Sequence, residues 1–276
     1  MNNATLSGKT ALIFGIASHR SIAWGIARAL ASNGANLILS YQDERIHTNV
    51  GRLAKQLRSE FGTKVLLLPC DVSDDAQITA FFQAAREHTE KVDFVLHSLA
   101  YAPRQALDGE FTQTTREDFV TAHDISVYSL LAITREALPL MQSGGSIVAM
   151  TFLGSQKVIP HYNVMGVAKA SLEASVRYLA ADLGPRGIRV NAISAGPMQT
   201  LAARGIADFS VMHKFHQEHS PLGRNCTLDE IGSAALFLAS AAASAVTGQV
   251  FYVDSGYSIL GMPELYMPHL PEGECV

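Results

Sequence analysis

Two residues that could act together on a carbonyl compound are Tyr162 and Lys169, which lie seven positions apart in an apolar, helix-like stretch. An α-helix returns to nearly the same azimuth after seven residues, so the phenol and the ammonium would share one face, two turns apart. A phenol donates a hydrogen bond at neutral pH, and a nearby cation makes its oxygen easier to deprotonate. The pair therefore suits a reaction in which negative charge develops on a carbonyl oxygen. The spacing alone leaves open a half-buried tyrosine and a surface lysine that coincide by chance.

A second pattern, near the N-terminus, is typical of a phosphate-binding turn. An apolar run at residues 10–14 leads to Gly15, and a helical pattern follows from residue 22 to residue 30, with Ser21 and Gly25 near its start. A turn between a strand and a helix N-terminus offers free N–H groups and the positive end of the helix dipole to an anion. Gly15 would permit a close approach of a pyrophosphate, Ser21 would bind a phosphate or cap the helix, and Gly25 would let the helix approach the sheet. Because the spacing is not G-x-G-x-x-G, an ordinary strand–helix turn also stays open.

Length and composition favour one large α/β domain or two small ones with a substantial core, and disfavour a nucleic-acid-binding or membrane protein. The 276 residues are 48% hydrophobic and 17% charged, with a formal net charge of −4 and no basic cluster. Residues 231–246 are too short and too rich in Ala and Ser for a membrane span, and the N-terminus lacks a secretory signal. Three cysteines without metal-ligand spacing favour a reduced, cytoplasmic setting. No carboxylate or cysteine completes a metal set with the cluster of His213, His216 and His219, so we expect no metal site and solvated histidines on a helix face.

Apolar strand-like runs alternate with amphipathic helical stretches along the whole chain. The runs occupy residues 11–14, 36–40, 65–69, 94–98, 146–151, 189–194 and 249–253, and the helical stretches include residues 45–61, 75–91, 116–141 and 164–183. This pattern predicts one doubly wound, Rossmann-like α/β domain with a seven-stranded parallel sheet that helices cover on both faces. The predicted domain spans residues 1–262, and a C-terminal tail follows at residues 263–276.

Small and polar residues follow the carboxyl ends of the predicted strands, where parallel sheets bind ligands. Asp71 would accept a hydrogen bond from an adenine amino group or cap the next helix, and both interpretations stay open. Gln42 would meet the adenosine ribose, and the acidic Asp43 and Glu44 that follow would repel a 2′-phosphate, which favours NADH over NADPH. Residues at the other strand ends would line the same crevice: Gly15, Ser98, Phe152 and Gly196.

These features resemble the short-chain dehydrogenase/reductase superfamily and, within it, the enoyl-acyl-carrier-protein reductases of bacterial type II fatty-acid synthesis. The resemblance covers residues 6–262. Most of the superfamily spaces the tyrosine and lysine by three residues, which would put Met165 in the place of the tyrosine, whereas the six-residue interval belongs to the enoyl reductase branch. The motifs that carry the resemblance are Gly15-x5-Ser21-x-Ala23-x-Gly25, Ile159-Pro-His-Tyr-Asn-Val-Met-Gly-Val-Ala-Lys169 and Arg189-Val-Asn-Ala-Ile-Ser-Ala-Gly-Pro197.

The resemblance implies hydride transfer from NADH to the 2,3 double bond of a trans-2-enoyl thioester carried on acyl carrier protein or coenzyme A. Tyr162 and Lys169 would be catalytic, with Tyr162 bonded to the thioester carbonyl and Lys169 to the nicotinamide ribose. It also implies a homotetramer, with the helical stretches at residues 116–141 and 164–183 as candidate interfaces. The predicted substrate-binding residues are Tyr101, Phe152 and Tyr162. The predicted cofactor-binding residues are Gly15, Ser21, Ile22, Gln42, Asp71, Val72, Ser98, Ala100, Lys169, Met198 and Thr200.

Two features depart from the family pattern. Phe152 stands where the family usually has a second tyrosine, which keeps an aromatic wall and loses a hydroxyl. The lid-like stretch at residues 201–215 has an apolar part, residues 209–215, which is either ordinary core or, by the resemblance, a cover for the acyl chain with Gly205 as a hinge. The stretch carries only two lysine or arginine residues. Weaker attraction to an acidic carrier protein would follow, and this favours coenzyme A as an alternative carrier.

Two other functions stay open. One is a carbonyl reductase or alcohol dehydrogenase, for which the shorter Tyr–Lys spacing and a serine at position 152 would be expected. The other is a catalytically weak dinucleotide-binding protein, which Phe152 favours and which the intact Tyr162 and Lys169 disfavour. NADH oxidation with enoyl thioesters distinguishes these functions from the predicted one.

Overall fold

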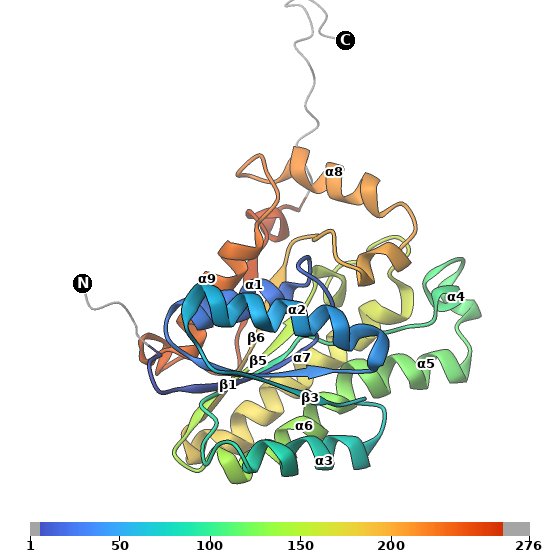
Figure 1. Cartoon of the computed structure of the whole chain (residues 1–276). Helices are drawn as coiled ribbons and strands as arrows, with labels where there is room; N and C mark the ends of the chain where they lie inside the picture. The colour runs from blue at the N-terminus through green and yellow to red at the C-terminus, as the bar shows by residue number, and fades with distance from the viewer. Residues whose placement is uncertain (1–5, 262–276) are drawn as a thin grey trace, which may run out of the picture.

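Seven parallel strands form the central sheet in the order β3-β2-β1-β4-β5-β6-β7 (Figure 1). The computed structural model describes residues 6–261. The strands are β1 (Thr10–Phe14), β2 (Asn36–Tyr41), β3 (Val65–Pro69), β4 (Phe94–His97), β5 (Gly145–Thr151), β6 (Ile188–Ala195) and β7 (Val250–Val253). The seven-stranded parallel sheet is therefore confirmed, and each strand end differs from the prediction by at most one residue. The strand order reverses between β1 and β4, where doubly wound sheets open a crevice for ligands.

Helices cover both faces of this sheet (Figure 1). One face carries α1 (Ile22–Ser32), α2 (Glu44–Phe61) and α9 (Leu228–Ala239), and the other carries α3 (Asp75–Arg86), α6 (Ser129–Ala137) and α7 (Asn163–Leu183). The remaining α-helices are α4 (Arg104–Leu107), α5 (Arg116–His123) and α8 (Phe209–His219), the last of which lies apart from both layers at the top of Figure 1. Within the described residues, no helix is both long enough and apolar enough to cross a membrane.

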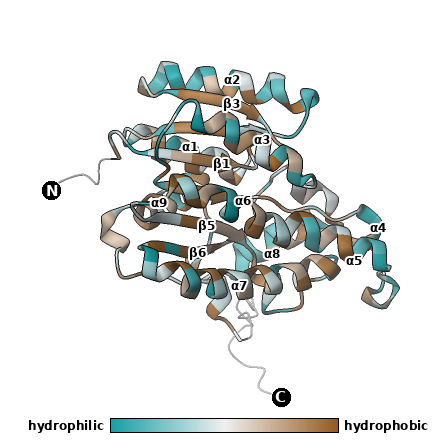
Figure 2. Cartoon of the chain, turned by 90° about the horizontal axis from the view of Figure 1, so that it is seen from below, coloured by the Kyte–Doolittle hydropathy of each residue, from teal (hydrophilic) through white to brown (hydrophobic). Residues whose placement is uncertain are grey.

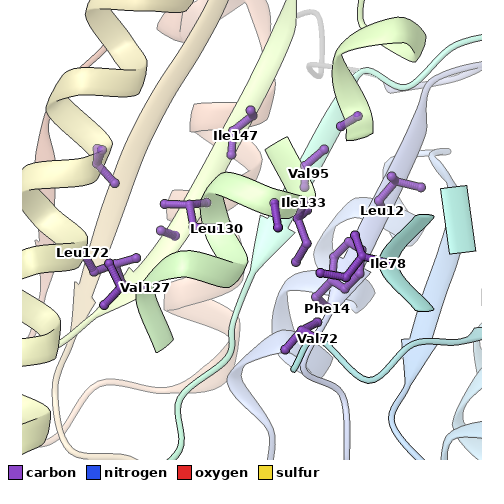
Figure 3. Packing of buried hydrophobic residues seen from close by; sticks show 14 of the residues in the cluster. Leu12, Phe14, Val72, Ile78, Val95, Val127, Leu130, Ile133, Ile147 and Leu172 are labelled. Carbon is purple, nitrogen blue, oxygen red and sulfur yellow. The ribbon is translucent and has the colours of Figure 1, made fainter. Parts of the chain in front are cut away.

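Two buried cores lie on opposite faces of the sheet. Along β1, Leu12 and Phe14 belong to one core and Ile13 to the other, because successive side chains of a strand alternate between faces. All of β1 is buried, as expected for a parallel strand that helices cover on both sides. The strands are mostly hydrophobic, which Figure 2 shows in brown. Figure 3 shows the first core, to which Ile78 of α3 and Leu172 of α7 belong together with Leu12 and Phe14.

The predicted helix at residues 116–141 is wrong as one continuous element. After α5 the chain forms a π-helical turn, Asp124–Tyr128, before α6, and a 3₁₀ turn at Leu138–Leu140 with a proline follows. The wide turn places Ser126 where its hydroxyl accepts from the Tyr101 N–H at 3.1 Å, and Ser129 where it bonds His97 Nε2 at 2.7 Å. Tertiary hydrogen bonds thus accompany the break in regular helical pitch, as is usual for π-turns near functional sites.

Three further boundaries differ from the sequence-based expectation. Helix α3 ends at Arg86 and not at residue 91, and the apolar stretch at residues 231–246 is split between α9 and a 3₁₀ turn, Ala241–Ala243. Helix α9 begins three residues earlier than expected because Thr227 and Glu230 form a reciprocal capping box. The predicted tail at residues 263–276 lies outside the described residues.

Gly25 brings α1 close to α9 and not, as predicted, to the sheet. A Cβ atom at Gly25 would lie 2.7 Å from the carbonyl oxygen of Leu228, and one at Gly232 of α9 would lie 2.8 Å from the carbonyl oxygen of Gly25. The facing glycines let the two helix backbones touch. This contact fixes the position of α1, whose N-terminus faces the candidate site.

Candidate active site

One cavity of about 710 Å³ gathers the predicted site residues at the carboxyl ends of the strands. Its walls come from the ends of β1, β2, β3, β4, β5 and β6, the first turn of α1 and the first two turns of α7. The segment from residue 196 to residue 212 also contributes. Fourteen predicted residues line it: Gly15, Ser21, Ile22, Gln42, Asp71, Val72, Ser98, Ala100, Tyr101, Phe152, Tyr162, Lys169, Met198 and Thr200. The fold thus brings every predicted position together, and the individual roles stay predictions.

The β1–α1 turn has the properties of an anion site. Gly15 has φ +104°, and a Cβ atom there would lie 2.1 Å from the carbonyl oxygen of Ser98, so only glycine fits. The Ser21 hydroxyl accepts from the N–H groups of Ala17 and Ser18, each at 3.1 Å, and it makes no cap bond to α1. The predicted alternative that Ser21 caps the helix through its side chain is therefore wrong. Helix α1 has no side-chain cap and no acidic residue in its first turn, which leaves its N-terminus suited to a pyrophosphate.

Asp71 lies at the end of the cavity where the adenosine is expected. Its carboxylate accepts from the Ser73 N–H and hydroxyl at 3.0 and 2.7 Å, and from Gln42 Nε2 at 3.2 Å. Burial opposes ionisation of Asp71, but the hydrogen bonds from Ser73 and Gln42 outweigh it and lower the pKa of the carboxyl. Asp74, not Asp71, caps α3, so the capping alternative for Asp71 is wrong. Asp71 is an ionised acceptor at the cavity wall.

Acidic groups follow Gln42 at the end of β2. Asp43 caps α2 by accepting from the Ile46 N–H at 3.1 Å, and its other oxygen accepts from Arg45 at 2.7 Å. The Arg45 hydrogen bond is the main reason that the pKa of Asp43 lies below its ordinary value. Arg45 is thus already paired, and the anionic Asp43 would oppose a 2′-phosphate more than a 2′-hydroxyl.

Lys169 is a cation held inside the cavity. Its ammonium donates to the carbonyl oxygens of Met150 at 2.8 Å and Leu99 at 3.5 Å, and the residue is 3% exposed. Burial lowers the pKa of Lys169 to about 8, against the opposing charge of Glu173 one turn further along α7. Glu173 is itself fixed by the Thr151 hydroxyl, which donates to it at 2.7 Å.

Tyr162 precedes α7 as its N-cap residue, so the expectation that it shares one helix with Lys169 is wrong. It lies between His161 and Asn163, whose φ values of +59° and +35° are rare for residues other than glycine. The Asn163 amide donates to the carbonyl oxygen of Gly109 at 3.1 Å and secures this turn. Tyr162 and Lys169 nevertheless meet at the cavity, because the turn directs the phenol toward it.

The Tyr162 phenol is a neutral hydrogen-bond donor. The residue is 8% exposed, and burial raises the pKa of its hydroxyl above the ordinary value. The hydroxyl has no hydrogen-bond partner among residues 6–261. The Phe152 ring packs edge-on against the Tyr162 ring, with 5.1 Å between centroids. A carbonyl oxygen entering the cavity would therefore find an uncommitted phenol against an aromatic wall.

The cavity also has an apolar wall that sequence reasoning only partly identified. Phe209 and Met212 belong to the segment expected to cover an acyl chain, and they line the cavity. Other lining residues were missed because apolar residues look alike in sequence whether they face a core or a cavity: Leu107, Ile125, Met165 and Ile206. A wall of this kind suits an alkyl chain.

The expectation of solvated histidines is wrong for His216. This residue is 6% exposed, its Nδ1 bonds the Asn225 side-chain oxygen at 2.7 Å, and its ring stacks on Tyr257 with 4.4 Å between centroids. His216 is thus part of the packing beneath α8, whereas His213 and His219 are partly exposed. Across residues 6–261 no group of three histidine, cysteine or acidic side chains is arranged to hold a metal ion.

Comparisons with known proteins agree with this geometry. A sequence model of the family described as enoyl-(acyl carrier protein) reductase matches residues 15–258. The enoyl-acyl-carrier-protein reductase (NADH) FabI of Bacillus cereus is 50% identical over 256 residues, which cover 93% of this chain and 99% of that protein. A crystal structure of the Bacillus cereus enoyl-acyl carrier protein reductase with NADP+ and indole naphthyridinone superimposes with a TM-score of 0.91 at 50% identity, covering 94% of this chain and all of that one. The reductase from Anaplasma phagocytophilum in complex with NAD gives a TM-score of 0.89 at 42% identity, covering 98% of this chain and all of that one.

Proposed function

The chain belongs to the enoyl-(acyl carrier protein) reductase family, and from this membership we propose that its cavity reduces the 2,3 double bond of trans-2-enoyl thioesters with NADH. The observation that carries the assignment of roles is the pairing of a neutral, unbonded Tyr162 phenol with a buried Lys169 in one cavity. The family membership makes the chain an NADH-dependent oxidoreductase of fatty-acid synthesis.

The chemistry requires an acceptor for charge at the carbonyl oxygen. An isolated double bond is a poor hydride acceptor, but conjugation to a thioester lets the incoming electrons move to oxygen. Bound NADH supplies the hydride to the β carbon of the thioester. Tyr162 donates a hydrogen bond to the resulting enolate oxygen, and its raised pKa keeps the proton on the phenol until that charge develops. The α carbon then takes a proton from solvent.

Lys169 has a role in positioning and in electrostatics. The Met150 and Leu99 carbonyl oxygens direct its ammonium, which leaves a remaining N–H to donate to the nicotinamide ribose. Its positive charge in a buried site also favours negative charge on the substrate oxygen. We assign Gly15, Ser21 and Ile22 to the pyrophosphate and Asp71 to the adenine.

The carrier of the acyl group is a separate part of the proposal. The α8 segment has few cations, and Lys214 is paired with Glu218 at 3.6 Å. We propose acyl-carrier-protein substrates, in keeping with the names of the relatives, with coenzyme A thioesters accepted by the same cavity. A panel of equal-length enoyl chains on each carrier tests this, since a large preference for coenzyme A in kcat/KM would exclude a dedicated carrier-protein enzyme.

The catalytic assignment is tested by replacing Tyr162 with phenylalanine. We expect Tyr162→Phe to lower kcat for crotonyl thioester reduction by ~10²–10³-fold, because one hydrogen bond to the developing oxyanion is lost. NADH affinity should not change. Tyr178→Phe is the matched control, since Tyr178 lies on α7 and is 77% exposed, away from the cavity. Full turnover by Tyr162→Phe would exclude the proposed role.

We further propose a homotetramer in a cytoplasmic setting. Helices α5, α6 and α7 and the π-helical turn leave apolar side chains exposed, namely Phe119, Val120, Tyr128, Leu131 and Val167. Such side chains on α5, α6 and α7 support an interface at the two predicted helical stretches. Light scattering of the purified protein tests the assembly, and a monomeric mass at micromolar concentration would exclude it. Cys70 and Cys226 are both free and buried, which is compatible with a reducing compartment.

A further inference from the structure

We propose that Gly154 and Gly166 are positioning residues for Tyr162, forming a side-chain-free seat that holds the phenol ring in its reactive orientation. The inference rests on the proposed function, in which Tyr162 is the hydrogen-bond donor to the substrate oxygen. Neither glycine lines the cavity, so neither touches the reacting atoms.

The seat is defined by contacts that no side chain could share. A Cβ atom at Gly154 would lie 2.4 Å from Tyr162 Cδ1 and 2.7 Å from Cε1. A Cβ atom at Gly166 would lie 2.8 Å from the carbonyl oxygen of Gly154 and 3.7 Å from Tyr162 Cδ1. The first turn of α7 thus packs on the 3₁₀ turn Leu153–Ser155, and that turn packs on the phenol ring. Phe152, which precedes this turn, also packs edge-on against the Tyr162 ring.

Backbone conformation does not explain these two glycines. Both have φ values outside the left-handed range in which glycine is favoured. Gly166 lies inside α7, where glycine costs roughly 1 kcal/mol of stability relative to alanine. Since neither position needs glycine for its backbone conformation, we attribute both glycines to the space that a missing side chain leaves for the Tyr162 ring and its turn.

The seat also explains why six residues, and not three, separate the tyrosine from the lysine. A three-residue interval would put the phenol at position 165, inside the first turn of α7, where Met165 is buried. Tyr162 instead precedes the helix, so its ring lies against Gly166 in that first turn. A side chain at position 154 would occupy the space of the ring, and one at position 166 would displace the Gly154 carbonyl in the turn on which the ring packs. The hydroxyl has no partner of its own among the described residues, so packing alone orients the ring.

The experiment compares Gly154→Ala and Gly166→Ala with the control Gly184→Ala. Gly184 ends the same helix, has φ −52°, and would place its Cβ with nothing within 4 Å. At position 154 the ring must move by about 1 Å to reach ordinary contact, and a displacement of that size can lower a rate by ~10²-fold. We expect kcat on crotonyl thioester to fall about that much in Gly154→Ala and by a smaller factor in Gly166→Ala, because the Gly166 Cβ would lie 3.7 Å from the ring and act through the Gly154 carbonyl. NADH dissociation constants should stay within about twofold, and the control should match wild type.

A double-mutant cycle separates positioning from general support of the fold. If the glycines act through the Tyr162 hydroxyl, adding Gly154→Ala to Tyr162→Phe should lower kcat by less than about twofold further. The inference would be overturned if the kcat losses of the two substitutions multiplied in the double variant, or if NADH affinity fell together with kcat. Full kcat in a folded alanine variant would also overturn it. If Gly154→Ala does not fold, Gly166→Ala provides the same cycle, since its closest contact is looser and alanine favours the helix. Failure of the wild type to oxidise NADH with any enoyl thioester would instead refute the proposed function.

Discussion

Raising the pH from 7 to 9 should weaken NADH binding, because it removes the charge of Lys169. Burial lowers the pKa of this ammonium to about 8, and only the cation can donate all three of its hydrogen bonds. The protonated fraction of a group with this pKa falls from roughly 0.9 at pH 7 to roughly 0.1 at pH 9. If the charged form dominates binding, kcat/KM for NADH should fall about tenfold over this interval, with a limiting slope of one decade per pH unit.

The assay is a fluorescence titration of NADH at pH 7, 8 and 9, with kcat/KM measured in parallel. The Tyr162 phenol does not contribute to the change, because burial raises its pKa and it stays neutral over this range. Lys169→Met is the control and should bind NADH weakly with no pH dependence. In the complex, the cofactor phosphates should raise the pKa of Lys169, so the alkaline limb of kcat should lie above that of kcat/KM.

Two results would refute this reasoning. NADH affinity that stays constant to pH 9.5 would mean that the ammonium is not depressed in pKa or does not contact the cofactor. A tenfold loss that persists in Lys169→Met would assign the titration to another group.

Three further predictions concern single positions. Phe152→Tyr should leave kcat/KM within about tenfold of wild type, which is a change of less than ~1.4 kcal/mol in the activation free energy. A larger gain in kcat/KM in the NADH-oxidation assay would identify the chain as a degraded or redirected relative. Gly25→Ala should lower the free energy of unfolding, measured in urea, by roughly 1–3 kcal/mol, because the new methyl group meets the Leu228 carbonyl oxygen at 2.7 Å. Gly51→Ala on α2 should be neutral or stabilising, because its Cβ would make only an ordinary 3.9 Å contact with Leu67. Glu230→Gln should cost at most about 1 kcal/mol at pH 7, because it removes the charge from the exposed ion pair with Arg224 while glutamine can keep the α9 capping box. The Arg224 hydrogen bond lowers the pKa of Glu230 from 4.5 to about 2. The contribution of the ionised Glu230 to the free energy of unfolding is therefore complete above pH 4.5 and is lost as the pH falls toward 2. The stabilities of wild type and Glu230→Gln should converge in acid.

Much of the fold could be predicted from sequence because buried parallel strands are short apolar runs between helical stretches. The run at residues 36–40 needs no knowledge of its neighbours to be identified as a strand, and β2 matches it to within one residue. The meeting of the strand ends could be predicted as well, because a parallel sheet places the carboxyl ends of its strands on one edge. That rule alone brought Gly15, Asp71 and Ser98 to a common cavity.

The tertiary structure decided the features that depend on contacts between distant segments. The break after α5 accompanies hydrogen bonds from Ser126 and Ser129 to strand and loop residues about 25 to 32 positions away. The partner of Gly25 is a helix some 200 residues further along, and no local pattern contains that information.

The sequence by itself determined the types of chemical group, a phenol and an ammonium at a set interval, and the sheet that collects them. Only the tertiary structure decided that Tyr162 precedes its helix, that Lys169 is buried deeply enough to titrate near pH 8, and that two glycines make room for the phenol ring. The physical reason is that strand and helix formation follow local periodicity, whereas burial, ring orientation and steric exclusion depend on atoms that meet only after folding.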